Sequence, residues 1–391
     1  MFRDPNHIEN LILQSSIIKT PSKTNCNGCN ICKKECAFLE RYGNPGEVAQ
    51  LCKTDPDKWL SIAFECSLCG LCSAICPRDI DPTAMFLYYR QKVVENGRKD
   101  FSKYKMLLNY EKKGTSSKYT YYHLPENCSS VFFPGCSLPG TRPDTTLKTY
   151  EYLQKQDKSM GIVLDCCTKP SHDLGRKDYF EKIFSEIKSY LLKNEISTVI
   201  VACPNCYKIF NTYGKEFKLK TVYEIIAQNE SPTTDLVSGK ISIHDPCPTR
   251  FEKEIHDSVR FIANAQGLEV KDTAHQKSNT FCCGEGGAVG CLTPEYARTW
   301  TKKRTGENQG QLIASYCAGC VNLLSKRAKT FHILDLIFDP EKTMAGKAKV
   351  SKAPFTYLNR LGLKKKLKRL PAKIQQERIH DSISNKIKNQ W

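Results

Sequence analysis

The spacing of its cysteines constrains this 391-residue chain more than any other feature, because most of its 21 cysteines fall into regular groups. Four starting at Cys26 are spaced C-x2-C-x2-C-x3-C, and four starting at Cys66 repeat the spacing 40 residues later. We recognise no secretory leader and no run of about 18 apolar residues, so we expect a cytoplasmic chain. Clustered cysteines in the cytoplasm bind metal more often than they form disulfides.

Zinc and iron–sulfur clusters are the two alternatives for these eight cysteines. Zinc usually takes four ligands from two C-x2-C pairs, which would leave cysteines of both runs unused. The observed spacing is that of bacterial ferredoxins, in which the fourth cysteine of each run ligates the other [4Fe–4S] cluster. Ala37 stands where proline commonly follows the first run. The predicted ligand sets are Cys26, Cys29 and Cys32 with Cys76, and Cys66, Cys69 and Cys72 with Cys36.

Ten further cysteines belong to an internal duplication. A double cysteine, followed by an apolar run that ends at C-x2-C, occurs twice with offsets of 114 to 116 residues. A single C-x2-C after a strand would indicate a thioredoxin-like dithiol, but a dithiol needs neither the double cysteine nor the repetition. The first copy offers Cys136, Cys166, Cys167, Cys203 and Cys206, and the second offers Cys247, Cys282, Cys283, Cys317 and Cys320.

Strand-like and helix-like segments alternate in both copies, which predicts α/β units with parallel sheets. The stretch between the first two cysteine runs has few strand signals and is predicted to be helical. We therefore expect an α/β protein with an N-terminal α-helical ferredoxin-like module and two Rossmann-like cysteine-rich repeats related by pseudo-symmetry. The expected divisions are a lead-in (1–20), a two-cluster ferredoxin-like domain (21–100), a linker (101–128), two cysteine-rich domains (129–230 and 240–340) and a basic amphipathic tail (341–391).

Three motifs of the duplicated region resemble those of a known family. They are Phe133-Pro-Gly-Cys136, His244-Asp-Pro-Cys247 and Cys282-Cys-Gly-Glu-Gly-Gly287. Over about residues 21–340 the chain resembles the heterodisulfide reductase family with paired cysteine-rich (CCG) domains. That family includes iron–sulfur subunits of glycolate, lactate and anaerobic glycerol-3-phosphate oxidising complexes. The resemblance implies up to two more [4Fe–4S] clusters, cubane or non-cubane, one in each five-cysteine set.

The same resemblance implies that such clusters handle thiol or disulfide chemistry or pass electrons to quinone or another carrier. Thr168 stands where the first copy would have glycine, so the cluster type there is left open. In the second copy, Gly284, Gly286 and Gly287 are expected to bring backbone N–H groups close to the cluster sulfurs, although such a stretch also fits a flexible loop. The second set is the expected catalytic centre: Cys247, Cys282, Cys283, Cys317 and Cys320.

The expected function is electron transfer. No dinucleotide, Walker or C-x2-C-H motif occurs, so no FAD, NAD, ATP or covalent haem site is expected. We expect an iron–sulfur subunit of an anaerobic oxidoreductase complex, with a flavoprotein or dehydrogenase as partner. The alternatives are a catalytic subunit that reduces a disulfide at a non-cubane cluster, and a zinc-dependent nucleic-acid-binding protein. We read His244 and His275 as structural, and Cys52, Cys128 and Cys291, outside all motifs, as buried apolar residues.

The C-terminal segment carries most of the formal charge of +18. Residues 341–391 hold fourteen Lys and Arg against three Asp and Glu, a net +11. Apolar residues from Leu363 to Trp391 recur at helical spacing. A basic amphipathic helix can bind the inner face of a membrane or an acidic partner protein, and Leu363, Leu367 and Leu370 would then form its anchoring face. Nucleic acid is a third alternative, because its binding needs only the positive charge. Truncation after Asp339 is then expected to leave the clusters intact.

Overall fold

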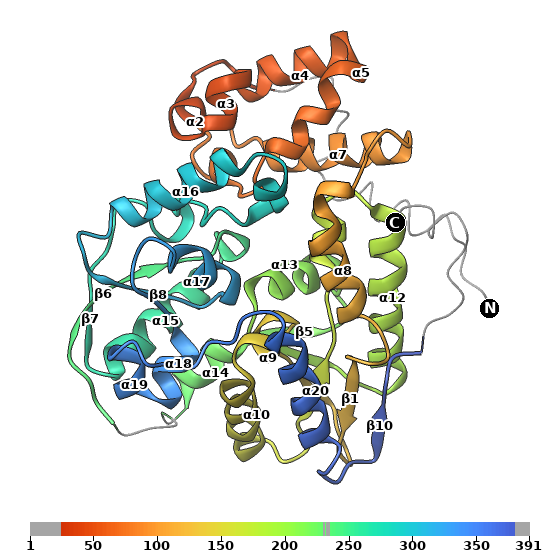
Figure 1. Cartoon of the computed structure of the whole chain (residues 1–391), viewed down its shortest axis with the longest axis vertical. Coiled ribbons are helices and arrows are strands. Elements are labelled where there is room, and N and C mark those ends of the chain that lie inside the picture. The colour runs from red at the N-terminus through yellow and green to blue at the C-terminus, as the bar shows by residue number, and fades with distance from the viewer. Residues whose placement is uncertain (1–24, 230, 232–234, 380–391) are drawn as a thin grey trace.

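The computed structural model describes residues 25–229, 231 and 235–379, so the expected lead-in at residues 1–20 lies outside the described residues. The N-terminal module is helical, as predicted, and forms the upper part of Figure 1. Asn44 caps the helix that begins at Pro45 with a capping box. Its side-chain Oδ1 accepts from the backbone N–H of Glu47 at 3.0 Å, and its own backbone N–H donates to Glu47 Oε2 at 2.8 Å. The elements are α2 (Ile31–Glu35), α3 (Ala37–Tyr42), α4 (Pro45–Thr54), α5 (Pro56–Trp59), η1 (Leu60–Glu65), α6 (Leu71–Ala74) and α7 (Pro82–Glu95).

The expected linker at residues 101–128 is wrong, because this stretch belongs to the folded body. It contains η2 (Ser102–Tyr104), α8 (Lys105–Gly114) and β1 (Tyr121–Leu124). Strand β1 is buried throughout and pairs antiparallel with β3 (Gly161–Leu164). Tyr104 and Leu108 lie in one apolar cluster with Phe64 and Val93 of the N-terminal module. The segment therefore joins the two parts by burying its apolar side chains between them.

The first cysteine-rich repeat is built on a six-stranded sheet in the order β10-β1-β3-β2-β4-β5. Strands β2 to β5 form its parallel part, and β1 and β10 are antiparallel additions at one edge. Strands β2, β3 and β4 read as short apolar runs because helices cover both faces of such a sheet, whereas the edge strand β5 carries two lysines. The other elements are β2 (Ser130–Phe133), α9 (Ser137–Thr141), α10 (Pro143–Gln156), α11 (Lys169–Asp173), α12 (Lys177–Lys193), β4 (Thr198–Val201), α13 (Pro204–Tyr213), β5 (Lys218–Thr221) and α14 (Val222–Gln228).

The second repeat has a four-stranded parallel sheet in the order β7-β6-β8-β9. This order matches β3-β2-β4-β5 of the first repeat, so the duplication read from the cysteines extends to the α/β unit. Its elements are β6 (Gly239–His244), η3 (Cys247–Thr249), α15 (Lys253–Ala265), β7 (Leu268–Val270), η4 (Lys277–Asn279), η5 (Gly286–Cys291), α16 (Pro294–Gly306), β8 (Leu312–Ser315), α17 (Ala318–Leu324), β9 (Thr330–His332), α18 (Ile333–Phe338) and α19 (Pro340–Met344).

The two repeats contact each other through equivalent elements. Helix α14 of the first repeat packs on α15 of the second, and α10 of the first packs on α18 of the second. Buried polar contacts cross this interface, because Arg142 Nε donates to Asp335 Oδ2 at 2.6 Å. The Tyr223 hydroxyl reaches the carbonyl oxygens of Ala202 at 2.8 Å and Tyr316 at 3.1 Å, one in each repeat. The interface is therefore specific as well as apolar.

The C-terminal segment packs into the first repeat, and the expected anchoring face is wrong for the described residues. Helix α20 (Phe355–Leu367) lies against α9 and α10, and β10 (Ile374–Gln376) pairs with β1 (Figure 1). Leu363 and Leu367 are 2% and 0% exposed, so this part of the apolar stripe faces the protein core, whereas Leu370 and Ile379 are 37% and 73% exposed. The last apolar positions, Ile383, Ile387 and Trp391, lie outside the described residues. Among the residues the structure describes, no helix has the length and apolar content needed to span a bilayer.

Candidate metal centres

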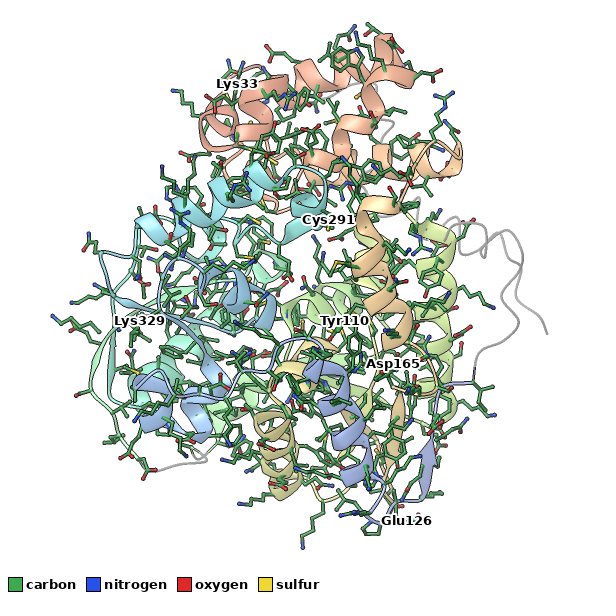
Figure 2. The ribbon with its side chains drawn as sticks, viewed as in Figure 1. Lys33, Tyr110, Glu126, Asp165, Cys291 and Lys329 are labelled. Atoms are coloured by element: carbon green, nitrogen blue, oxygen red, sulfur yellow. The ribbon has the colours of Figure 1, made fainter. Side chains whose placement is uncertain are left out.

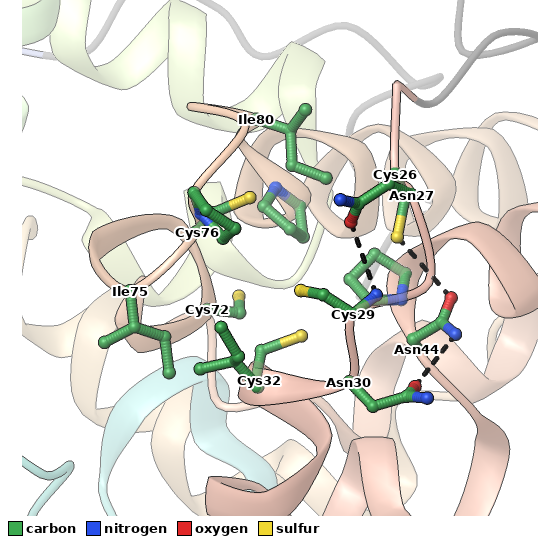
Figure 3. Close-up of a pocket in the computed structure, with 14 residues that line it drawn as sticks. Cys26, Asn27, Cys29, Asn30, Cys32, Asn44, Cys72, Ile75, Cys76 and Ile80 are labelled. Atoms are coloured by element: carbon green, nitrogen blue, oxygen red, sulfur yellow. Dashed lines mark hydrogen bonds between the residues drawn. The ribbon is translucent and has the colours of Figure 1, made fainter.

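Four cysteines of the first predicted set line one pocket of the N-terminal module (Figure 3). Cys26 and Cys29 come from the loop that leads into α2, Cys32 lies in α2 itself, and Cys76 follows α6. The loop is tied to α4, because the Cys26 thiol donates to Asn44 Oδ1 at 3.6 Å. The fold thus brings the distant fourth cysteine to the other three, as the ferredoxin spacing predicts.

Cysteines of the second predicted set line a neighbouring pocket. Cys36, Cys66, Cys69 and Cys72 surround it, together with Trp300 from α16 of the second repeat. The two pockets also share part of their lining, because Cys32 and Cys72 line both of them. The two sets are therefore adjacent, and the second set lies where the module meets the second repeat.

Burial holds several of these thiols in their neutral form when no metal is present. Burial and then the neighbouring thiols raise the pKa of Cys32 to about 11 and that of Cys36 still further. Burial also raises the pKa of Cys66 to about 12, although the charge of Arg90 opposes it. Metal binding must therefore release protons from these groups. Two crowded sets of four thiols fit [4Fe–4S] clusters, whose irons are held by thiolates.

The cysteines of the first repeat gather at the carboxyl ends of its parallel strands. The chain runs from β2 to β3 on one side and then crosses to β4 on the other, and such a reversal leaves a crevice at the strand ends. Cys136 follows β2, Cys166 and Cys167 follow β3, and Cys203 and Cys206 follow β4. The sulfur atoms of Cys136 and Cys166 are 3.8 Å apart, and those of Cys167 and Cys206 are 3.4 Å apart. The topology thus brings together the five cysteines of this copy.

Two arginines of the C-terminal segment reach this first-repeat site. Arg378 donates to Asp165 Oδ2 through Nε at 3.0 Å and Nη2 at 2.8 Å, and Asp165 Oδ1 accepts from the Cys166 amide at 2.7 Å. Figure 2 labels Asp165. Arg360 is 1% exposed, and its Nη1 has no hydrogen-bond partner in the described part of the chain. A hydrogen bond from Cys166 and the charge of Arg360 lower the pKa of Cys136 to about 7, although burial opposes the shift. Sequence reasoning missed both arginines, because it separated the tail from the repeat.

Thr168 adopts the backbone conformation that suits glycine at this turn. Its φ is 54°, and Gly284, the equivalent residue of the second repeat, has φ 104°. A β-branched residue in the left-handed region is strained, and the Thr168 hydroxyl is buried without a partner among the described residues. The turn after the double cysteine therefore keeps its positive φ despite the substitution, and the cluster type in this copy stays a prediction.

The second repeat assembles its cysteines in the same way. Cys247 follows β6, Cys282 and Cys283 come after β7, and Cys317 and Cys320 follow β8. Four of these five residues are buried, and Cys247 is half-buried. The Sγ atoms of Cys283 and Cys320 lie within 4.8 Å of each other.

His244 joins this second-repeat site, although sequence analysis treated it as structural. One of its ring nitrogens lies within 4.8 Å of the sulfur atoms of Cys283 and Cys320, and all three residues are buried. Burial and then the charge of Arg304 lower the pKa of His244 to about 3. A lone histidine has no metal-ligand spacing, so the only sequence signal was its place three residues before Cys247 at the end of a strand.

The glycines after the second double cysteine serve two purposes. The Gly284 amide donates to Cys282 Sγ at 3.3 Å, in line with the expected contact between backbone and sulfur. Gly286 and Gly287 instead allow a close approach to the N-terminal module. A Cβ at Gly286 would lie 2.4 Å from the carbonyl oxygen of Ser67, and a Cβ at Gly287 would lie 2.6 Å from the carbonyl oxygen of Cys66. The structure thus gives Gly286 and Gly287 a steric role, because any side chain there would collide with the N-terminal module. That these glycines tune the potential of a cluster stays a prediction.

Arg250 connects the second ferredoxin-like set to the second repeat. Its Nε donates to the Cys69 carbonyl at 3.0 Å, and its Nη2 donates to the Thr280 carbonyl at 2.8 Å. Sequence reasoning did not single out this residue. The two cysteine sets also share one apolar cluster, which contains Leu71, Phe281, Cys282 and Trp300 with Cys36, Cys69, Ile75 and Cys247 packed against it.

The residues read as structural have mixed outcomes. Cys52 is buried in the core of the N-terminal module, as predicted. Cys128 is only half-buried, and Cys291 is exposed, so the prediction of burial is wrong for Cys291 (Figure 2). His275 stacks on Phe281 with ring centroids 3.7 Å apart, which agrees with its structural assignment.

Family models match both parts of the chain. Residues 25–81 match the 4Fe-4S dicluster domain, and residues 130–211 and 241–325 match the cysteine-rich CCG domain. These matches imply iron–sulfur clusters and agree with the folded positions of the module and the two repeats. The zinc alternative for the N-terminal module is not supported, because the matching domain is a dicluster iron–sulfur domain.

Several curated proteins are similar to this chain at low identity. An uncharacterized iron–sulfur protein of Methanocaldococcus jannaschii is 22% identical over 77% of this chain and 66% of its own length. One subunit of the fumarate reductase (CoM/CoB) of Methanothermobacter marburgensis is 25% identical over 61% of this chain and 51% of its own length. One subunit of the dihydromethanophenazine:CoB–CoM heterodisulfide reductase of Methanosarcina barkeri is 20% identical over 66% of this chain and 71% of its own length.

The chain thus spans about half to two thirds of the length of the first two relatives. Its own matches are a dicluster domain followed by two cysteine-rich domains. It therefore belongs to the iron–sulfur proteins that join a 4Fe-4S dicluster domain to two cysteine-rich (CCG) domains, and it is a distant homologue of these heterodisulfide reductase and fumarate reductase subunits.

Proposed function

We propose that this chain is the iron–sulfur subunit of an anaerobic oxidoreductase complex. It carries electrons between a partner flavoprotein or dehydrogenase and a quinone, a thiol/disulfide pair or another carrier. The observation that carries this proposal is the contact between the second ferredoxin-like set and the second repeat through Cys69, Arg250 and the shared apolar cluster. The relatives named as subunits of reductases support a role within a complex.

The four cysteine sets follow one another through the molecule. The first set includes Cys29, which is exposed, and its pocket shares walls with the second. The second set adjoins the second repeat. Burial lowers the pKa of Lys169, but Asp173 and then the thiols of Cys247 and Cys167 raise it, so this residue lies near cysteines of both repeats. Clusters held in these sets would supply one-electron transfer. The exposed first set is therefore the end at which we place a partner.

Replacing Cys69 by serine tests this arrangement. We expect Cys69→Ser to remove or alter one signal in the reduced EPR spectrum and to lower the iron content by up to about four atoms per chain. Electron transfer from a reduced dye to the clusters of the repeats should slow, because Cys69 is the ligand next to the second repeat. Stopped-flow absorbance under anaerobic conditions measures that rate.

Cys291→Ser is the matched control, because Cys291 is exposed and belongs to no set. It should keep every signal and the wild-type rate. A Cys69→Ser protein with unchanged spectrum, iron content and rate contradicts both the ligand set and the proposed order.

A second candidate function is catalytic reduction of a disulfide at the repeats. Buried polar groups between the two cysteine-rich sites favour it. Lys169 forms an ion pair with Asp173, and burial raises the pKa of Glu285 next to Gly319 of the second repeat. Under this reading Cys247, Cys282, Cys283, Cys317 and Cys320 form the catalytic set. The purified chain with reduced dye would then consume a disulfide and release thiols, whereas a relay protein on its own would not.

A further inference from the structure

One buried side chain of the second repeat lacks a hydrogen-bond partner within the described part of the chain. His244 ends β6, where the parallel sheet holds its backbone, and its carbonyl accepts from the Ser315 hydroxyl at 3.1 Å. The side chain is 0% exposed, and neither Nδ1 nor Nε2 has a hydrogen-bond partner among the described residues. Leaving a buried polar group unpaired costs about 1–3 kcal/mol, so such groups normally have a partner.

The imidazole is directed toward the cysteine set of the second repeat. One ring nitrogen and the Sγ atoms of Cys283 and Cys320 lie within 4.8 Å of one another. Nitrogen and thiolate sulfur are both ligands for iron in iron–sulfur proteins. A metal between the His244 ring and the two thiols would therefore give the ring nitrogen the partner that it lacks among the described residues.

The first repeat lacks this nitrogen. Phe133 ends β2, three residues before Cys136, just as His244 ends β6 three residues before Cys247. Phe133 packs on Phe210, with ring centroids 5.2 Å apart, in the apolar core. The same strand position is thus an apolar core residue in one copy and an unpaired imidazole in the other, so the two copies offer different donor sets.

We propose that His244 is a nitrogen ligand of the iron–sulfur cluster in the second repeat. This inference rests on the proposed function, since it requires a cluster in that repeat. A neutral imidazole adds no negative charge where a thiolate would add one, and histidine ligation raises the potential of an iron–sulfur centre. The cluster of the second repeat is then easier to reduce than that of the first repeat, which makes the second repeat the preferred acceptor for the adjoining N-terminal module.

Pulsed EPR of the full chain, purified anaerobically and stepped through reducing potentials, tests this ligand directly. Protein grown with 15N-histidine should show strong histidine-nitrogen hyperfine coupling in one signal, compared with unlabelled protein. The coupling should disappear in His244→Phe, which copies the first repeat, while the iron content stays near wild type. In His244→Cys the midpoint potential of that signal should shift downward, because a thiolate replaces the neutral ring.

His275→Gln is the control, since His275 stacks on Phe281 and its Nδ1 already pairs with Glu307, and it should keep the coupling. The labelled wild-type protein needs no variant, so the test stands even if His244→Phe does not fold. Absence of histidine-nitrogen coupling from every signal overturns the proposal, as does coupling that survives in His244→Phe. Zinc in place of iron in the second repeat is a different result, because it overturns the proposed function itself.

Discussion

A chain truncated after Lys349 is expected to lose the folded first repeat. The deletion removes α20 and β10, and with them Leu363 and Leu367 from the core. Burying each leucine contributes about 1.5–3 kcal/mol. The deletion also removes Arg378, the ion-pair partner of the fully buried Asp165. Breaking a buried ion pair costs about 3–5 kcal/mol. The total, roughly 6 to 11 kcal/mol, matches the whole stability of a typical domain, about 5–15 kcal/mol.

The truncated chain should therefore be largely insoluble or protease-sensitive between residues 120 and 230. This outcome reverses the expectation that a chain cut after Asp339 keeps its clusters. Soluble yield, limited proteolysis and iron content of the two chains measure it. A truncated protein that is soluble, resistant and fully loaded with iron would show that α20 and β10 are dispensable.

Arg378→Met isolates one contribution to this loss. We expect it to lower the free energy of unfolding by about 3–5 kcal/mol, because Asp165 keeps its charge but loses two N–H donors in a buried site. Lys373→Met is the matched control, since Lys373 is exposed and, among the residues the structure describes, forms a single long surface pair, with Glu126 at 3.9 Å. Surface pairs contribute about 0–1 kcal/mol. Equal thermal midpoints for the two variants contradict this account of the C-terminal segment.

Replacing Arg90 is expected to separate the N-terminal module from both repeats. This fully buried side chain on α7 donates to the carbonyls of Ala63 at 3.0 Å, Cys66 at 2.5 Å, Asp173 at 2.7 Å and Gly287 at 2.9 Å. These four carbonyls belong to the module, the first repeat and the second repeat. Arg90→Met leaves all four buried without this donor, at about 1 kcal/mol or more each, so we expect a loss of about 4 kcal/mol.

Limited proteolysis and thermal unfolding under anaerobic conditions measure the effect of Arg90→Met. The variant should unfold at a lower temperature and release the N-terminal module from the repeats on digestion. Lys92→Met on the same helix is the control, because Lys92 is only half-buried and its contacts stay on its own helix, an ion pair with Glu95 at 2.7 Å and a ring contact with Tyr88. If both variants melt together with the wild type, Arg90 does not hold the three parts together.

Local sequence patterns predicted which cysteines lie together, because ligand spacing and strand–helix alternation are short-range properties; that these sets ligate clusters stays a prediction. The runs at Cys26 and Cys66 imply a fixed loop geometry, and the structure brings each predicted set around its own pocket. The duplicated cysteines likewise fall at the ends of parallel strands, since every copy has the same strand order. Here the local pattern and the tertiary fold agree.

Contacts between distant parts of the chain escaped prediction. Strand β1 pairs with β10, and Tyr122 lies opposite Gln376, more than 250 residues away. The amphipathic pattern of α20 is the same whether its apolar face meets a membrane or a protein core, so the sequence could not distinguish the two. His244 and Arg90 are single residues without a motif, and only the assembled fold shows what surrounds them.

Metal analysis of the anaerobically purified chain tests the central claim most directly. Four cysteine sets that each hold a [4Fe–4S] cluster predict about sixteen iron and sixteen acid-labile sulfide per chain, with zinc only in trace amounts. About eight iron would confine the clusters to the N-terminal module and contradict the proposed relay through the repeats. Stoichiometric zinc without iron would contradict the account as a whole.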